Sequence, residues 1–204
     1  MKDVFCKLVK DFSSDEIKIG ECWAEISKQY GARNRHYHTL KHLESLYAEL
    51  SLVKNEIQDF PAVLFALFYH DVVYNAVKKD NEEKSAEFAE SRMKNLNIPE
   101  KIILKTTAHI LATKSHEISA DPDTNLFTDA DLSILGADWD SYEMYANQVR
   151  KEYRIFPNVL YNPGRKNVLL HFLSMPHIFK TEFFRVKLEG QARKNIEREI
   201  LWYA

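Results

Sequence analysis

The sequence has few of the residues that make turns. It contains 5 glycines and 6 prolines among 204 residues, which is about half of what average usage would supply. Sandwiches and barrels of β-strands need many tight turns, so this scarcity argues against them. We therefore predict an all-α fold.

Cysteine and long apolar runs are also scarce. Two cysteines, Cys6 and Cys22, cannot form a disulfide framework for a chain of this length, and we expect both to be reduced thiols. The longest apolar run covers residues 62–69, far fewer than the roughly 20 residues of a membrane span. The N-terminus also becomes charged too early for a signal peptide. We expect a soluble cytoplasmic protein that does not bind a membrane.

Neither sign of charge is in large excess. Lys and Arg number 28 against 30 Asp and Glu, for a net charge of −2, so the chain lacks the basic footprint of a nucleic-acid-binding protein. With 45% apolar and 28% charged residues, it is typical of a folded globular protein. The length suits one domain over 1–204. We expect its core at about 20–155, with C-terminal helices at 166–202 packed on that core.

Apolar residues recur with the period of an α-helix along most of the chain. Four segments carry such stripes: 19–30, 40–53, 86–96 and 103–110. Segment 60–69 is apolar on all sides and has Pro61 in its first turn. This pattern predicts a central, buried helix.

The remaining segments indicate loops and further helices. Segment 117–128 contains proline and several Asn and Asp residues, which is typical of a loop. Segment 161–164, Tyr-Asn-Pro-Gly, is the strongest turn signal in the chain. Helices are expected again at 168–173 and 181–202.

Histidine is crowded into one part of the chain, with six of the eight histidines between positions 36 and 116. His70 and Asp71 directly follow the apolar segment 60–69. Burying a His and an Asp is costly unless each has a strong partner. A divalent metal ion is one such partner, because imidazole nitrogen and carboxylate oxygen are its usual ligands.

Further candidate ligands lie on both sides of this pair. His38 and His42 are four residues apart, and His109 and His116 follow with intervals of four and three through Thr113. Such intervals place side chains on one face of a helix. Two carboxylates come next, where we expect a helix to begin: Asp129 and Asp131.

Taken in this order, the residues resemble the HD-domain superfamily of metal-dependent phosphohydrolases. That family places a first His, an adjacent His-Asp pair and a distant Asp on an α-helical bundle. The matching residues are His38 for the first ligand, His70 and Asp71 for the pair, and Asp131, with Asp129 as its alternative, for the last.

A narrower likeness is to a bacterial group described only as predicted HD-superfamily phosphohydrolases. It covers roughly residues 20–200. The stretches that carry it are Tyr37-His38-xxx-His42, Phe68-Tyr69-His70-Asp71-xx-Tyr74, Asp80-Asn81-Glu82-Glu83-x-Ser85-Ala86, Ala112-Thr113-Lys114-x-His116 and Asp129-Ala130-Asp131-Leu132.

The resemblance implies an HD-type helical bundle that hydrolyses a phosphate ester or anhydride of a small molecule, with a nucleotide as one candidate. The cofactor would be a divalent metal ion (Mn, Mg, Fe, Co, Ni or Zn) that activates a water molecule. Asp71 would also orient or deprotonate that water, and Glu82 or Glu83 would serve in acid-base catalysis. Lys114 would contact the phosphate as a cation. The remaining substrate-binding residues would be Arg35, His42 and His116.

Other interpretations stay open. A di-iron oxygenase of the HD type would bind two iron atoms per chain and use both His109 and His116 as ligands. A catalytically silent HD module would bind a nucleotide or a protein partner even without its metal ligands. Glu82 and Glu83 could instead complement a helix dipole, and Lys114 could be a solvated lysine. The apolar residues of the last helix serve either the core or a homo-oligomer surface: Phe184, Leu188 and Ile196.

Overall fold

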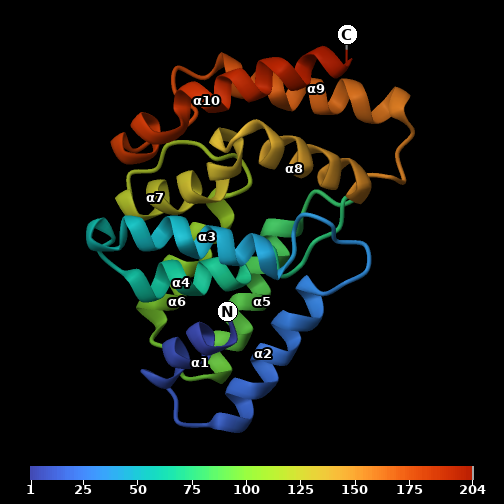
Figure 1. Ribbon diagram of the computed structural model, residues 1–204. Coiled ribbons are helices and arrows are strands. Elements are labelled where there is room, and N and C mark those ends of the chain that lie inside the picture. The colour runs from blue at the N-terminus through green and yellow to red at the C-terminus, as the bar shows by residue number, and fades with distance from the viewer. Residues whose placement is uncertain (204) are drawn as a thin grey trace. The chain divides into compact units, whose positions relative to one another are not determined.

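The computed structural model describes residues 1–203, which form ten α-helices, three short 3₁₀ helices and no strand (Figure 1). The predicted all-α fold is therefore confirmed. The chain divides into two compact units: the first is Met1–Thr128 and the second begins at Asp129. The boundary falls inside one helix, α7. A single domain over 1–204 stays a prediction.

The first unit is built around helix α4. Its elements are α1 (Lys2–Lys10), α2 (Glu16–Tyr30), α3 (Leu40–Leu52), η1 (Lys54–Glu56), α4 (Phe60–Tyr69), α5 (Asn81–Asn95), α6 (Glu100–Ala112) and the first seven residues of α7 (Pro122–Asp131). Every residue of α4 from Ala62 to Tyr69 is buried, and the helix packs against α1, α3, α5 and α6. The predicted central helix is confirmed.

Helix α4 begins and ends as its sequence indicates. The Asp59 carboxylate accepts a hydrogen bond from the backbone N–H of Ala62, and Pro61 lies in the first turn, where its missing N–H costs nothing. No helix in the described part of the chain is long and apolar enough to cross a bilayer.

The expected loop at 117–128 is wrong from Pro122 onward, because helix α7 begins there. Proline at the first position and an acidic residue in the first turn, here Asp123, favour a helix start as much as a loop. The Asp123 carboxylate is fully buried and accepts the backbone N–H groups of Gln58 and Asp59, each at 2.8 Å. Packing against the segment before α4 thus decides that this stretch is helical.

The second unit is organised around helix α10. Its elements are the end of α7, η2 (Leu132–Gly136), α8 (Trp139–Glu152), α9 (Asn158–Ser174), α10 (Glu182–Ile200) and η3 (Leu201–Tyr203). Helix α10 packs against η2, α8, α9 and η3. At Gly136 a Cβ atom would lie 2.5 Å from Cβ of Leu188, so the close approach of η2 to α10 requires glycine.

A buried polar network joins the helices of this second unit. The Glu199 carboxylate is fully buried and receives two hydrogen bonds from the Arg165 guanidinium, at 2.8 and 2.9 Å. It also accepts the hydroxyl groups of Tyr142 at 2.6 Å and Tyr203 at 2.8 Å. Burial raises the pKa of Tyr142, so this hydroxyl stays a donor. The network connects α8, α9, α10 and η3.

The expected turn at 161–164 is wrong, because α9 runs through it with Pro163 inside the helix. Tyr161 and Leu169 are buried, and the Arg150 guanidinium lies 4.5 Å from the centre of the Tyr161 ring. Burial of these side chains holds the backbone helical although the local sequence favours a turn. The expected helix at 168–173 is the second half of this longer one.

Candidate metal centre

His70 is oriented by the end of the buried helix that precedes it. Its side chain is 1% exposed, and its Nδ1 lies 3.0 Å from the backbone carbonyl oxygen of Leu67. A carbonyl oxygen can only accept, so Nδ1 carries a proton and donates it. In the neutral ring the other nitrogen, Nε2, then carries the lone pair, as in histidines that ligate metal ions.

Two further polar atoms converge on this lone pair. His42 Nε2 and Asp71 Oδ2 each lie 3.2 Å from His70 Nε2. The carboxylate oxygen is an acceptor, and two acceptors this close repel each other unless positive charge lies between them. A proton or a cation at His70 Nε2 would satisfy both contacts.

His38 joins the cluster from the segment before α3. Its Nε2 lies 3.8 Å from Asp71 Oδ2, and its ring stacks on Tyr74 with the ring centres 4.3 Å apart. The expectation that His38 and His42 share a helix face is wrong, since α3 begins only at Leu40. The turn into the helix nevertheless brings the two rings to 6.0 Å.

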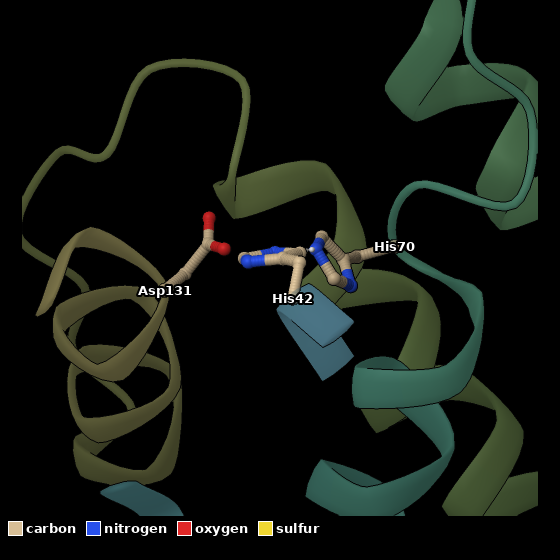
Figure 2. A group of neighbouring side chains, drawn as sticks. All are labelled: His42, His70 and Asp131. Carbon is tan, nitrogen blue, oxygen red and sulfur yellow. Dashed lines mark hydrogen bonds between the residues drawn. The ribbon is translucent and has the colours of Figure 1, made fainter. Parts of the chain in front are cut away.

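Helix α7 contributes Asp131. Contacts within the first unit hold this helix against α4 and α6: the Phe127 ring centre lies 5.8 Å from that of His70, and Thr124 bonds His109. Residues four apart share a helix face, so Asp131, four residues after Phe127, faces the same way. His42, His70 and Asp131 each offer one ligand atom, and these atoms lie within 4.8 Å of one another (Figure 2).

These distances fit a divalent cation. Ligands about 2.1 Å from a metal ion lie roughly 3.0 to 3.4 Å apart in octahedral and tetrahedral arrangements, which matches the two contacts of His70 Nε2. Imidazole and carboxylate are the donor set of Zn²⁺, Fe²⁺ and Mn²⁺ sites. The residues that could hold the ion are His42, His70 and Asp131, with Asp71 and His38 beside them.

Asp129 has a different environment from Asp131. Its carboxylate is fully buried and accepts the backbone N–H groups of Lys180 and Thr181, at 2.9 and 2.7 Å. It also accepts the Thr181 hydroxyl at 2.8 Å and the Lys180 ammonium at 3.2 Å. The expectation that Asp129 and Asp131 open a helix is wrong, since both lie in the last turn of α7.

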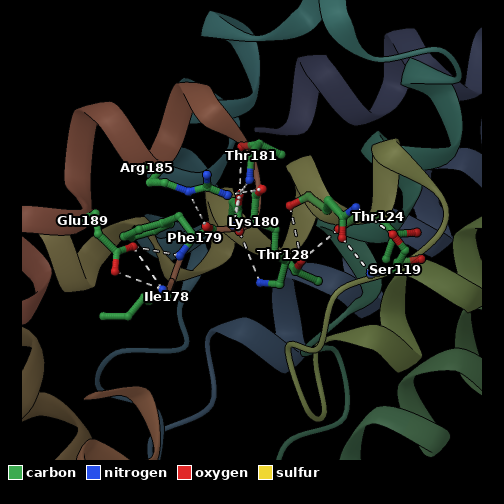
Figure 3. A network of polar contacts seen from close by, with 11 residues as sticks. Ser119, Thr124, Thr128, Ile178, Phe179, Lys180, Thr181, Arg185 and Glu189 are labelled. Atoms are coloured by element: carbon green, nitrogen blue, oxygen red, sulfur yellow. Dashed lines mark hydrogen bonds and ion pairs between the residues drawn. The ribbon is translucent and has the colours of Figure 1, made fainter. Parts of the chain in front are cut away.

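The segment that binds Asp129 is itself held by α10 (Figure 3). The Glu189 carboxylate accepts the backbone N–H groups of Ile178 and Phe179, and the Arg185 guanidinium donates to the carbonyl groups of Phe179 and Lys180. These hydrogen bonds pair the backbone of residues 178–180 with side chains of α10, and they fix the segment that faces Asp129.

No family model, curated protein or solved structure matches this chain. The geometry of its own side chains therefore carries the functional inference.

The predicted acid-base and phosphate-binding residues lie at the start of α5 and the end of α6. Lys114 forms an ion pair with Glu83, and this hydrogen bond raises the pKa of Lys114 and lowers that of Glu83. Glu82 is half-buried in the same first turn of α5. Arg35 is buried, and its guanidinium donates to backbone carbonyl groups.

His109 and His116 do not share a helix face, contrary to the expectation from their spacing. Helix α6 ends at Ala112, and His116 lies beyond it with a φ of 51°, a left-handed conformation that His adopts more readily than most residues. His109 is fully buried, and its Nδ1 lies 2.8 Å from Thr124 Oγ1. Burial lowers the pKa of His109, so its ring is neutral near pH 7.

His42 is the residue whose position the sequence interpretation underestimated. The motif order predicted that His42 binds the substrate, whereas its ring lies in the group that could hold the metal ion. A signal existed: His42 is four residues before Leu46 and eight before Leu50, on the buried stripe of α3. A histidine on the buried face of a helix needs a polar partner inside the protein.

Proposed function

We propose that this chain is a metal-dependent phosphohydrolase of the HD type, acting on a phosphate ester or anhydride of a small molecule. The observation that supports it most is that His42 Nε2 and Asp71 Oδ2 each lie 3.2 Å from His70 Nε2, and that Asp131 offers a ligand atom within 4.8 Å of those of His42 and His70. The motif order that resembles the HD superfamily is the second support. A nucleotide is one candidate substrate.

The metal ion would be held by His42, His70 and Asp131, with His38 and Asp71 as further ligands. A divalent cation at this point lowers the pKa of a water molecule and polarises a phosphoryl oxygen. The buried rings of His42 and His70 keep bulk water from the inner side of the site. Asp71, whose side chain is 17% exposed, is the carboxylate that can take a proton from an attacking water.

Lys114 would contribute to phosphate binding. The Lys114 ammonium is 46% exposed and pairs with Glu83, so a substrate phosphate would compete with this carboxylate for it. The net charge of −2 gives the whole chain no attraction for anions. Binding of a phosphorylated molecule would therefore depend on the metal ion and on local cations such as Lys114.

Metal analysis of the purified chain, followed by a phosphate-release screen over nucleotides and sugar phosphates, tests this proposal. We expect bound divalent metal and release of phosphate that falls by roughly 100-fold or more in Asp71→Ala. Asp11→Ala, at an exposed position after α1, is the matched control and should keep the wild-type rate.

Equal, negligible release by wild type and Asp71→Ala with every metal tested would contradict the hydrolase function. Two iron atoms per chain and oxygen consumption would support the oxygenase interpretation instead. Nucleotide binding that survives loss of the metal-binding side chains would support a silent binding module.

A further inference from the structure

Arg35 occupies a position that differs from that of a substrate ligand. It lies between α2 and α3 and is only 6% exposed. One guanidinium nitrogen, Nη1, donates to the carbonyl oxygen of Asp71 at 2.7 Å and to that of His38 at 3.2 Å. The other, Nη2, donates to the carbonyl oxygen of Val72 at 2.9 Å.

Two tyrosine rings also lie beside the guanidinium. Its central carbon lies 4.9 Å from the centre of the Tyr30 ring and 5.4 Å from that of Tyr74. The same two tyrosines contact the metal-site segments: the Tyr30 hydroxyl accepts the backbone N–H of Asp71 at 3.2 Å, and Tyr74 stacks on the His38 ring. The side chain is therefore enclosed by the segments that carry the ligands.

We propose that Arg35 is a positioning residue that fixes His38 and the His70–Asp71 turn relative to each other for metal binding. Its guanidinium hydrogen-bonds to the backbone of both His38 and Asp71. This inference rests on the metal-dependent function proposed above. It replaces the earlier expectation that Arg35 binds the substrate phosphate.

The chemistry of the position requires arginine. Three carbonyl groups from two segments are reached at once by the planar fork of a guanidinium, whereas the ammonium of lysine is a compact point charge. The position also lies just past the C-terminus of α4, where the helix dipole favours a cation. Loss of the fork would remove these three hydrogen bonds and let the His38 segment move away from Asp71.

The first test measures the affinity of the full chain for Mn²⁺ alone, by electron paramagnetic resonance of the free ion. We expect Arg35→Met to raise the dissociation constant about 10- to 100-fold, the usual range for groups that orient metal ligands. Arg35→Lys should stay at least about 10-fold weaker than wild type, because charge without the fork does not restore the contacts. Arg33→Met, at an exposed neighbouring position, should leave the affinity unchanged.

A purely structural role predicts a different pattern. The melting temperature of the metal-free variants would then fall while the folded fraction bound Mn²⁺ with wild-type affinity. That result would overturn the proposal, as would full recovery of affinity in Arg35→Lys.

A measurement on the unmodified protein covers the case in which Arg35 variants do not fold. By linkage, a group that favours metal binding is itself held more firmly when the metal is bound. Zn²⁺ should therefore slow hydrogen exchange of the Arg35 guanidinium in NMR spectra. Arg92, which pairs with Glu25 between α5 and α2, should be unaffected. Equal exchange of Arg35 with and without Zn²⁺ would overturn the proposal.

The outcomes separate the two proposals. Wild type that binds Mn²⁺ without hydrolysing any phosphate compound, together with weaker binding by Arg35→Met, contradicts the hydrolase function and supports the positioning role. Active wild type with unchanged affinity in Arg35→Met contradicts the positioning role alone. Absence of metal binding by wild type contradicts both.

Discussion

At the residue scale, Asp129 and Asp131 show how two identical side chains on one helix acquire different roles. Residues two apart point to different sides of a helix. Asp131 faces His42 and His70, whereas Asp129 accepts hydrogen bonds from Lys180 and Thr181. One carboxylate lies in the group that could hold a metal ion, and the other binds a neighbouring segment of the chain.

We predict that Asp129→Asn lowers stability, whereas Asp131→Asn lowers metal affinity. Asp129→Asn removes the negative partner of the Lys180 ammonium, whose side chain is 6% exposed, and should lower the free energy of unfolding by about 3–5 kcal/mol. Asp131→Asn should change stability little in chelator but weaken Mn²⁺ binding by roughly 100-fold. Urea unfolding and metal titration measure the two quantities.

Asp140→Asn, at an exposed position in α8, is the control for both measurements and should resemble wild type. A large loss of metal affinity in Asp129→Asn that remained folded, with normal binding by Asp131→Asn, would reverse the assignment.

At the element scale, α9 is a helix that its local sequence does not favour. Pro163 has no N–H to donate to the carbonyl group of Val159, four residues earlier, and proline inside a helix costs about 3 kcal/mol relative to alanine. The helix forms because Tyr161 and Leu169 are buried and because Arg165 pairs with Glu199. These tertiary contacts offset the local cost.

We predict that Pro163→Ala raises the free energy of unfolding by about 1–3 kcal/mol, because it restores the missing backbone hydrogen bond. Gly164→Ala should add about 0.5–1 kcal/mol, since no atom lies within 4 Å of the Cβ position there. Asn167→Ala, an exposed position in the same helix, serves as control with a change of about 0.5 kcal/mol or less. Destabilisation by Pro163→Ala in urea unfolding would show that the helix needs its proline.

At the scale of the whole molecule, the proposed metal centre would couple folding to ligand binding. The candidate ligands come from α3, from the end of α4 and from α7, which are far apart in the sequence. The unfolded chain cannot hold them together, so an ion that binds the native protein alone stabilises it by mass action.

We predict that Mn²⁺ or Zn²⁺ at 100 times its dissociation constant stabilises the native protein by about 2.7 kcal/mol. For a chain of this length, that corresponds to a rise in melting temperature of roughly 5–10 °C, and a chelator should reverse it. His70→Gln should abolish the rise, whereas His171→Gln, an exposed position on α9, should retain it. An equal rise in wild type and His70→Gln would place metal binding elsewhere in the chain.

The sequence alone determined the fold class and the central element. Scarce turn residues and helical periodicity are local, composition-level properties, so they were sufficient to predict an all-α fold and a buried helix at 60–69. The position of His70 and Asp71 in the chain was also enough to predict a polar site there, because a polar pair at the end of an apolar helix needs polar partners inside the protein.

Only the tertiary structure decided which side chains meet. The sequence cannot distinguish Asp129 from Asp131, since the face that each presents depends on what packs against α7. It predicted that His42 and Arg35 bind the substrate. In the structure, the His42 ring lies beside His70, and the Arg35 guanidinium donates hydrogen bonds to backbone carbonyl groups. The turn signal at 161–164 failed for the same reason. Local preferences amount to a kcal/mol or so per residue, and burial and hydrogen bonding between distant segments exceed them.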